Sequence, residues 1–455
     1  MFKAAATIGR RLFGYAIAKE SLARSHAPLT LLSEDRELPP HDRKKAVSRS
    51  RELWHDFAIV TWAVRKHVDY VARFTFKSQT DIPELDAQIE RIIHHWGKRG
   101  NFEVTGRYSL NEFIRIAEAC RTIDGDIGIL KLADGRLQAI EGDRIRNPLG
   151  VRENDPDWVH GVRVDNCGAP LSYAIHSRAR VRDFQFERMV DAHNMILHGY
   201  YTRFDQVRGI GLLVSAANAF KDVSDSFDFA LAKSKAMQLF GLKFRRSEDA
   251  DPLTDEQKEF EKQRRLSLKG KASYMVELMP GEDLDTIQDG FPSNQFQDYT
   301  KLMIMVALKS LDLCYSMFDE SHTNFFGSRA GIVQYNESCK QKREGNQNLL
   351  DQLTRWKLAN EIMHNRLILP DKMTVNDLWF EWTPSGLPWW KADEEAKGFM
   401  TTIVSGFDSY TGVCSQLGKD FKDVILQRKA DEEFARKHNV NLPTFAAEVN
   451  INMNN

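Results

Sequence analysis

Long apolar runs and clustered cysteines are both missing from this 455-residue sequence. No run of about 18 apolar residues exists, so no segment is predicted to span a membrane. The five cysteines are odd in number and widely scattered, with no CxxC pair and no Cys/His cluster at metal-ligand spacing. They are typical of reduced thiols in a cytosolic protein, and neither a metal site nor a cofactor is predicted.

An excess of either charge is missing as well. Lysine and arginine number 63 and aspartate and glutamate 64, which leaves a formal net charge of −1. A protein that grips nucleic acid by displacing counterions from many phosphates is usually clearly basic. The balance disfavours a tight DNA binder, but it leaves room for a protein that surrounds DNA without holding it.

Motifs of catalysis and nucleotide binding are absent. There is no GxxxxGK[ST], GxSxG or HExxH, and the GIG at 209–211 has neither a preceding strand nor a third glycine. His193 and His198 are five apart, which is the wrong spacing for ligands on one helix face. Asp124 and Asp126 are candidates for paired carboxylates, but DGD before a strand is more often an ordinary turn. No catalytic residue is assigned, and the chain is not expected to be an enzyme.

Apolar residues are plentiful, at 42% of the chain. With 455 residues, the chain is long enough for two or three domains with buried cores. Residues 1–50 are expected to form an extended N-terminal arm. The start, MFKAAATIGRRLFGYAIAKESLARS, is also typical of an organelle transit peptide. Glu20 and the charged continuation SEDRELPPHDRKK favour the arm.

The next part of the chain predicts an α+β segment, with helices first and then a small antiparallel sheet. Helical periodicity runs over 51–77, and a second helix over 84–96 ends at Gly97. Ser109 and Glu112 form a capping box that begins a third helix. The pattern then switches to period two, and two hairpins are predicted between residues 127 and 176.

The second half of the sequence is predicted to be mainly helical. A long amphipathic helix is expected over 211–240, then a charged segment in which Thr254 and Gln257 form another capping box. The helix expected over 294–316 is apolar around most of its circumference, so it should be covered on most sides. A helix over 330–367, a connector rich in Pro and Trp and two further helical stretches separated at Gly418 complete the chain.

The stretch DESHTNFFGSRAGIVQY at 319–335 separates two of these helices. Phe325 and Phe326 allow three interpretations: buried core, a platform on which bases stack, or part of a mobile loop that makes contacts in a restricted space. A stacking platform should have a basic groove beside it. Composition alone favours buried core.

Six short motifs occur in an order that resembles the lambda-like family of tailed-phage portal proteins over nearly the whole chain. They are DGDIGILKLADGRLQAIEGDRI (124–145), GVRVDNCGAPLSYAI (161–175), QVRG (206–209), LMPGEDL (278–284), NFFGSRAGIVQY (324–335) and KADEEAKGFMTTIVSGFDSYTGVCSQLGKDFKDVILQR (391–428). Each motif is weak alone, and six in the right order are a strong signal. The sequence departs from the family pattern where TRFD replaces a proline before QVRG and where Lys391-Ala392-Asp393 replaces DP. The chain is also short for the family.

The resemblance implies an α+β portal fold, mainly helical, assembled as a ring of typically twelve subunits at one capsid vertex. Double-stranded genomic DNA would pass through the ring during packaging and ejection. The family architecture, laid over this sequence, gives an arm (1–50), a wing (51–208), two stem helices (209–245 and 294–317), a clip (246–293), a tunnel loop (318–329), a long helix (330–369) and a crown (370–455). Partners would be the terminase, the major capsid protein and a head-tail connector, in the virion and, during assembly, the host cytoplasm.

The same resemblance assigns candidate site residues. The tunnel loop nearest the DNA would comprise His322, Thr323, Asn324, Phe325, Phe326, Gly327, Ser328 and Arg329. The channel-lining stem helix would present Lys301 and Lys309, and the clip would dock partners through Arg264, Arg265, Lys269 and Lys271. Two other classes of protein stay open: a soluble α+β enzyme with Asp124 and Asp126 in a cleft, and a monomeric nucleic-acid-binding module that stacks bases on Phe325 and Phe326.

Overall fold

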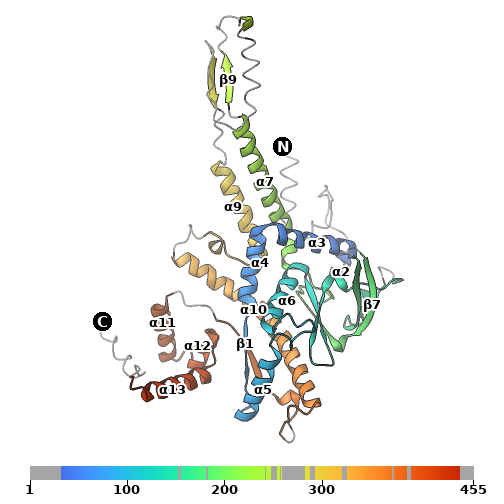
Figure 1. The fold of residues 1–455 in the computed structure, drawn as a ribbon, viewed down its shortest axis with the longest axis vertical. Helices are drawn as coiled ribbons and strands as arrows, with labels where there is room; N and C mark the ends of the chain where they lie inside the picture. Colours follow the sequence, from blue (N-terminus) through green and yellow to red (C-terminus); the bar gives the residue numbers. More distant parts are fainter. Residues whose placement is uncertain are drawn as a thin grey trace. The chain divides into compact units, whose positions relative to one another are not determined.

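The structure is a computed structural model. It describes residues 32–151, 155–180, 183–240, 242–246, 254–256, 258, 282–286, 293–319, 325–370, 373–386 and 391–440. The chain forms two compact units, whose elements are labelled in Figure 1. An α+β unit comprises Met1–Asn218 and Ala307–Asn455, and a helix-pair unit comprises Ala219–Val306.

The α+β unit contains helices from both ends of the sequence. They are α2 (Glu34–Glu37), α3 (Pro40–Asp56), α4 (Ala58–Val71), α5 (Pro83–Trp96), α6 (Leu110–Asp124), α10 (Phe325–Met363), α11 (Ala392–Val404), α12 (Tyr410–Gln416) and α13 (Phe421–Lys437). Short 3₁₀ turns connect several elements: η1 (Gly142–Arg144), η2 (Ala192–Asn194), η3 (Leu212–Ser215), η4 (Lys309–Leu311), η5 (Tyr315–Met317) and η7 (Val375–Asp377).

Three antiparallel sheets belong to this unit. Their strands are β1 (Phe74–Ser78), β2 (Asp126–Lys131), β3 (Leu137–Glu141), β4 (Trp158–Val159), β5 (Val162–Val164), β6 (Pro170–Arg180), β7 (Asp183–Asp191), β8 (Met195–Gly199) and β11 (Phe380–Pro384). The orders are β3-β2-β8, β4-β5-β6-β7 and β1-β11. Strand β2 is central in its sheet and almost fully buried, which suits its β-branched residues Ile127 and Ile129.

The β-rich part of the unit has one continuous apolar core. Its buried members are Leu130, Ile140, Ile145, Val162, Val164, Tyr173, Ile175, Val190 and Met195. They come from the two larger sheets and the turn after η1. Both predicted hairpins are confirmed, β2-β3 around the Asp134-Gly135 turn and β5-β6 around 165–169. Strands β7 and β8 were not predicted.

Two predicted helices are confirmed in detail. Helix α5 ends at Trp96, with Gly97 as its C-cap. Helix α6 begins after Ser109, whose hydroxyl accepts a hydrogen bond from the Glu112 amide while the Glu112 carboxylate accepts one from the Ser109 amide. These signals lie within a few residues of the helix ends, so they do not depend on the rest of the fold.

The single helix predicted over 51–77 is wrong. Two helices, α3 and α4, are separated at Phe57, whose backbone is extended, and residues 74–78 form β1. Strand β1 pairs with β11, about 300 residues later in the chain. Local periodicity cannot indicate so distant a partner, so it could not predict this strand. The extended arm is also wrong for residues 40–50, because they lie in α3 and bury Ala46 and Ser50. Residues 1–31 lie outside the described part of the chain.

The helix-pair unit contains most of α7 (Ala217–Phe240) and of α9 (Asn294–Leu308). Strands β9 (Leu242–Arg246) and β10 (Glu282–Thr286) pair antiparallel between them. Strand β9 occupies the end of the region expected to belong to the first stem helix. The second capping box cannot be assessed, since Gln257 lies outside the described residues.

Three helix ends differ from the sequence predictions. Helix α7 begins at Ala217 rather than Gly211, because 212–215 form η3. Helix α9 ends at Leu308 rather than near 316; η4 follows, and Asp312 then adopts a left-handed conformation (φ 60°) that an α-helix cannot continue through. The C-terminal region has three helices rather than two, with Gly418 between α12 and α13 as expected.

Candidate functional site

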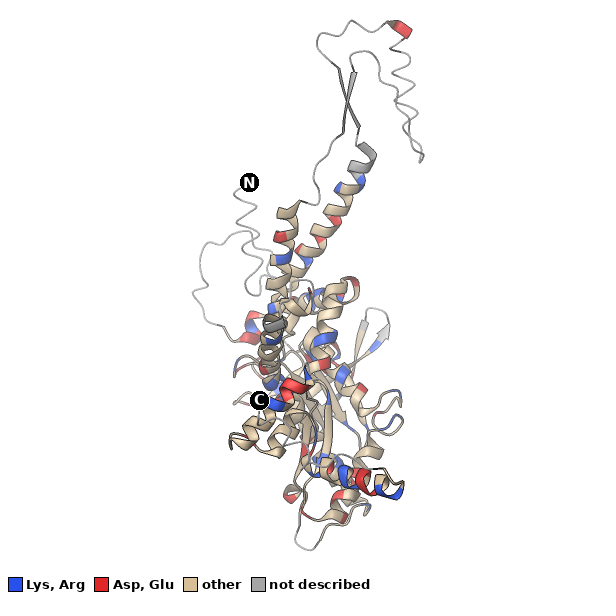
Figure 2. Ribbon diagram, turned by 90° about the vertical axis from the view of Figure 1, so that its left-hand side faces the viewer, with Lys and Arg blue, Asp and Glu red and all other residues tan. Residues whose placement is uncertain are grey.

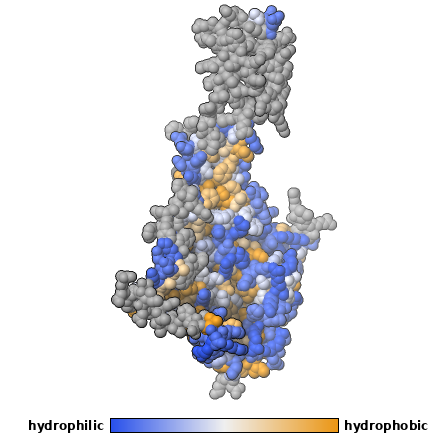
Figure 3. All heavy atoms as spheres, turned by 60° about the vertical axis from the view of Figure 1, so that its left-hand side comes forward, coloured by the Kyte–Doolittle hydropathy of each residue, from blue (hydrophilic) through white to orange (hydrophobic). Residues whose placement is uncertain are grey.

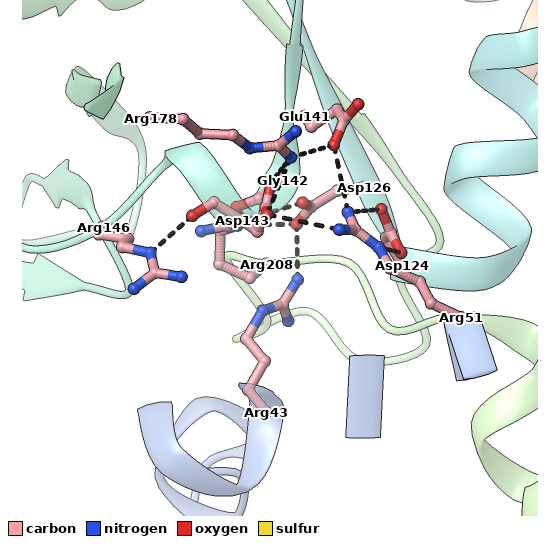
Figure 4. Close-up of polar contacts among 10 residues, drawn as sticks. All are labelled: Arg43, Arg51, Asp124, Asp126, Glu141, Gly142, Asp143, Arg146, Arg178 and Arg208. Atoms are coloured by element: carbon pink, nitrogen blue, oxygen red, sulfur yellow. Dashed lines mark hydrogen bonds and ion pairs between the residues drawn. The ribbon is translucent and has the colours of Figure 1, made fainter. Parts of the chain in front are cut away.

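The first candidate site is a cluster of paired charges that begins with Asp126 and Arg208 (Figure 4). Two guanidinium nitrogens of Arg208, Nε and Nη2, donate to the two carboxylate oxygens of Asp126, at 2.7 and 2.8 Å. The side chains are 1% and 0% exposed. The backbone amide of Gly209 donates to the same carboxylate at 2.9 Å. The pair is therefore bidentate, buried and supported by the backbone.

Every donor of Arg208 is used. Its remaining N–H groups donate to the carbonyl oxygens of Gly142, Ile145 and His160. A guanidinium has five donors, and all five are satisfied here. Burial opposes the charged form of Asp126, but the charges of Arg208 and Arg43 outweigh it and lower the pKa of Asp126. The carboxylate is therefore held ionised inside the fold.

Helix α3 contributes two more arginines to this cluster. Arg43 donates to Asp126 at 3.1 Å, and Arg51 makes two bonds to Asp124 at 2.8 and 2.5 Å. Around Arg51 lie the acidic side chains of Glu141 and Asp143, both at 3.4 Å. Arg178 of β6 completes the group, paired with the same two acidic residues (Figure 4).

This geometry weighs against the enzyme alternative. Asp124 and Asp126 are each paired with arginine, so neither carboxylate is free to bind a cation. Within the described ranges there is no group of three or more His, Cys, Asp or Glu side chains that could hold a metal ion. The described helices also include none that is long and apolar enough to cross a membrane.

Three motifs that are separate in the sequence meet in the cluster. DGD (124–126) supplies Asp124 and Asp126. EGDRI (141–145) supplies the carbonyl acceptors of Gly142 and Ile145, and QVRG (206–209) supplies Arg208. The backbones come so close that a Cβ on Gly125 would lie 2.4 Å from the Gly209 carbonyl oxygen. The cluster thus fixes the segment 206–211, which leads directly into η3 and α7.

A second buried network attaches α10 to the rest of the α+β unit. Its centre is the Glu118 carboxylate of α6, which is fully buried. It pairs with Arg121 at 2.6 Å and accepts hydrogen bonds from Tyr200 at 2.5 Å and from Asn346 of α10 at 2.9 Å. Burial opposes ionisation of Glu118, but the Arg121 charge and the bond with His67 outweigh it and lower the pKa.

Two more contacts hold the middle of α10. Arg343 donates to the Tyr70 carbonyl oxygen of α4 at 2.8 Å, and His198 of β8 lies 2.9 Å from the Asn346 side-chain oxygen. Burial, and then the Arg121 charge, lower the pKa of His198 to about 3, so the ring is neutral at pH 7.

The predicted tunnel loop is shorter than expected. Residues 322–324 (His322, Thr323 and Asn324) lie outside the described residues, whereas 325–329 are the first residues of α10 and not loop. The helix begins five residues before the expected start at Ala330. At the N-terminal end of the predicted loop, the Phe318 ring packs on Trp62 of α4, with ring centroids 5.8 Å apart.

The structure places only part of the expected DNA-facing set. The side chains of Phe325, Phe326 and Ser328 lie outside the described part, so the three interpretations of the phenylalanines stay open. Gly327 and Arg329 are exposed. Arg329 forms an ion pair with Glu395 of α11 at 3.4 Å.

The two lysines expected on one stem helix lie on different elements. Lys301 is half-buried on α9, whereas Lys309 is exposed on η4, beyond the end of that helix. The four predicted clip residues, Arg264, Arg265, Lys269 and Lys271, all lie outside the described residues. Figure 2 shows basic and acidic residues interspersed along the described ribbon, in agreement with the charge balance of the sequence.

The helix-pair unit leaves apolar side chains exposed on both helices. On α9 the stripe is Tyr299, Leu302 and Val306, with Leu302 53% exposed, while Met303 and Ile304 are buried. On α7, Phe229 is 74% and Leu231 54% exposed. Figure 3 shows apolar surface, in orange, over the described parts of these helices. The expectation that this helix is covered on most sides stays a prediction, because the single chain leaves Tyr299, Leu302 and Val306 exposed.

Comparison with known families decides the classification. A profile of the family described as "Phage portal protein, lambda family" matches residues 26–343, which is more than half of the chain. The chain belongs to this family. It is therefore a phage portal protein, from a family of structural proteins and not of enzymes, and the resemblance inferred from the six motifs is confirmed.

A curated relative and solved structures are similar to this chain. A "Probable portal protein" of Halomonas phage phiHAP-1 is 24% identical over 364 residues, which span 75% of this portal protein and 69% of that one. In structure, the fold matches a chain from the neck of an empty gene transfer agent (GTA) particle, computed with C6 symmetry, at a TM-score of 0.51. That match has 14% identity and covers 82% of this chain and 93% of the other. A chain from the neck of the native particle, computed with C12 symmetry, gives 0.49 at 15% identity, over 84% and 94%.

Sequence reasoning missed most of the charged partners in this portal protein. Arg43 was placed in an arm, and Glu118, Arg121 and Asn346 were not singled out. The only available signal was charge inside an otherwise apolar helix pattern, as in FIRIAEACRTID, where Glu118 and Arg121 lie on the buried face of α6. A charged residue that falls on an apolar stripe is usually paired inside the fold.

Proposed function

We propose that this portal protein assembles as a ring of identical subunits, typically twelve, around a channel for double-stranded genomic DNA. In this proposal α7 and α9 are the stem helices that surround the channel. The part of the α+β unit up to residue 208 is the wing, which meets the major capsid protein. Residues 246–293 are the clip, residues 318–324 with the start of α10 the tunnel loop, and α11 to α13 the crown.

The observation that carries the proposal is the set of exposed apolar side chains on α7 and α9, of which Tyr299, Leu302 and Val306 form one stripe on α9. Exposed apolar patches of this kind usually mark an interface between proteins. A head-to-tail contact that repeats around a closed ring covers such a stripe on every copy. Obligate interfaces of this type are large and apolar. The nearly neutral chain also suits a channel, since moving DNA should not meet a deep electrostatic well.

Purified protein in light scattering and negative-stain microscopy tests the ring directly. We expect ring-shaped particles, and class averages along the axis would give the number of subunits. A chain that stays monomeric under all conditions, with no ring views, would end the proposal. The stacking alternative instead predicts salt-sensitive affinity for short single strands that drops when Phe325 and Phe326 both become alanine.

The proposed clip supplies the docking surface for the terminase and later for the head-tail connector, through Arg264, Arg265, Lys269 and Lys271. Exposed charges at such a rim set the encounter rate and selectivity more than the affinity. Replacing Lys269 and Lys271 by alanine should weaken terminase binding to isolated rings and reduce its salt dependence. Lys258→Ala is the matched control, because Lys258 is an exposed lysine of the same segment, paired with Asp255 at 2.9 Å. Equal binding by the double variant and by the control would contradict the assignment.

A further inference from the structure

An ion pair connects helix α11 with the start of α10. Arg329, in the fifth position of α10, lies 3.4 Å from the Glu395 carboxylate in the first turn of α11. The Glu395 side chain is 16% exposed and that of Arg329 44%. The pair links two segments that are more than 60 residues apart in sequence.

The acidic partner of Arg329 comes from the first turn of another helix. That turn of α11 contains Asp393, Glu394 and Glu395, and carboxylates there favour α11 because its first turn carries the positive end of the helix dipole. Glu395 therefore favours the start of α11 and also pairs with Arg329 of α10.

The C-terminal helices are also fixed at a second place. Lys77 of β1 pairs with Asp423 of α13 at 2.7 Å and with Glu90 of α5 at 3.2 Å. Just after β11 the backbones come so close that a Cβ on Gly418 would lie 2.4 Å from the Gly386 amide nitrogen. The group α11 to α13 thus has one attachment to the sheet β1-β11 and another to the start of α10.

The middle of α10 is held independently of these helices. Arg343 and Asn346 bond to α4 and α6, and Lys342 pairs with Asp312 at 2.8 Å. Asp312 is the left-handed residue just after η4. A change at Glu395 should therefore move the first turns of α10 without releasing the rest of the helix.

We propose that Glu395 is a positioning residue that sets the first turns of α10 through Arg329, so that the C-terminal helices control how the channel holds packaged DNA. In this assignment Arg329 acts on Glu395 and not directly on DNA. The inference rests on the proposed function, in which the segment before α10 faces the channel.

Charge exchange separates these two roles of Arg329. The variants Arg329→Glu and Glu395→Arg each place like charges at the contact, and the double variant restores an opposite pair. We expect each single variant to assemble rings and to lower the amount of genome retained in filled heads by about fivefold, the low end of coupling between two sites. The double variant should return retention to near the wild-type amount. Glu394→Arg is the matched control, since Glu394 lies in the same turn but pairs with Lys391, and it should retain DNA normally.

Two results would overturn the inference. If Glu395→Arg retains DNA normally while the double variant is as defective as Arg329→Glu, Arg329 acts on DNA directly. If all variants, Arg329→Glu included, retain DNA as the wild type does, the contact has no role in retention. Ring formation and packaging by the wild-type protein are measured alongside, and their absence would count against the proposed function rather than against this contact.

Discussion

The α+β unit buries paired charged side chains, whereas the described residues of the helix-pair unit bury none and expose apolar side chains on both helices. Asp126 and Arg208 are 0% and 1% exposed with every guanidinium donor used, while Leu302 and Phe229 are 53% and 74% exposed. A buried ion pair is tolerated only when all its partners are in place. An exposed apolar stripe is covered only when another chain arrives. The comparison teaches that stability of the first unit is decided within one chain, and that of the second in the proposed assembly.

The largest effect should come from breaking the buried pair. Arg208→Met leaves the Asp126 carboxylate buried with Arg43 as its remaining charged partner, so the free energy of unfolding should fall by about 3–5 kcal/mol. The midpoint of urea unfolding, followed by tryptophan fluorescence, measures it. The control is Arg136→Met, which removes an exposed pair with Asp134 and should cost about 1 kcal/mol or less. Equal losses of unfolding free energy in the two variants would show that the buried pair contributes no more to stability than the exposed one.

The next effect should appear in assembly and not in folding. Leu302→Ser removes one apolar side chain from the exposed stripe, and since about half of that side chain is exposed, each subunit contact should weaken by about 1–1.5 kcal/mol. Sedimentation velocity at falling protein concentration should show rings that dissociate earlier, while the urea midpoint of the dissociated chain stays unchanged. Met303→Ser is the contrast, because Met303 is buried in the same helix. That variant should lower the urea midpoint instead, and a Leu302→Ser variant that behaves like it would break the comparison.

The third effect concerns pH. Burial and the Arg121 charge lower the pKa of His198 to about 3 in the folded chain, below the ordinary 6.5. The unfolded chain then takes up the proton first, so the stabilisation is complete above pH 6.5 and is lost as pH falls toward 3. Between pH 7 and pH 5 the loss should reach up to about 2 kcal/mol.

The variant His198→Gln isolates this contribution. It should lose less of its urea midpoint than the wild type does between pH 7 and pH 5. Some loss should remain, because burial also lowers the pKa of His160, to about 4, and acts in the same direction. An identical pH dependence in both proteins would mean that His198 is not kept neutral by its surroundings.

Signals that lie close together in sequence predicted the structure well. The capping box at Ser109 and Glu112, the glycine after α5 and the Asp134-Gly135 hairpin are each completed within a few residues. Their energies depend on neighbouring backbone groups, so no distant contact is needed to form them. The apolar circumference of α9 was predictable for a similar reason, since helical spacing alone places side chains on each face.

Predictions failed where a distant partner decides the conformation. Residues 74–78 continue a helical pattern, but they form a strand because they pair with β11. Residues 40–50 looked like a solvated arm because their charges were counted as exposed, yet Arg43 reaches Asp126 inside the fold. The helix after the predicted tunnel loop begins at Phe325, and α9 ends at Leu308 instead of near 316. The local sequence contains no signal that predicts the start of α10 or the end of α9.

The sequence by itself determined the family, because the order of the short motifs can be recognised without knowing what each motif does in the fold. It also determined the charge balance and the locally capped helices. Only the tertiary structure decided what DGD and QVRG do, because an ion pair between residues 82 positions apart exists only once the chain has folded. Only the fold, too, gave Arg329 an acidic partner in Glu395, since that contact requires two helices to be brought together.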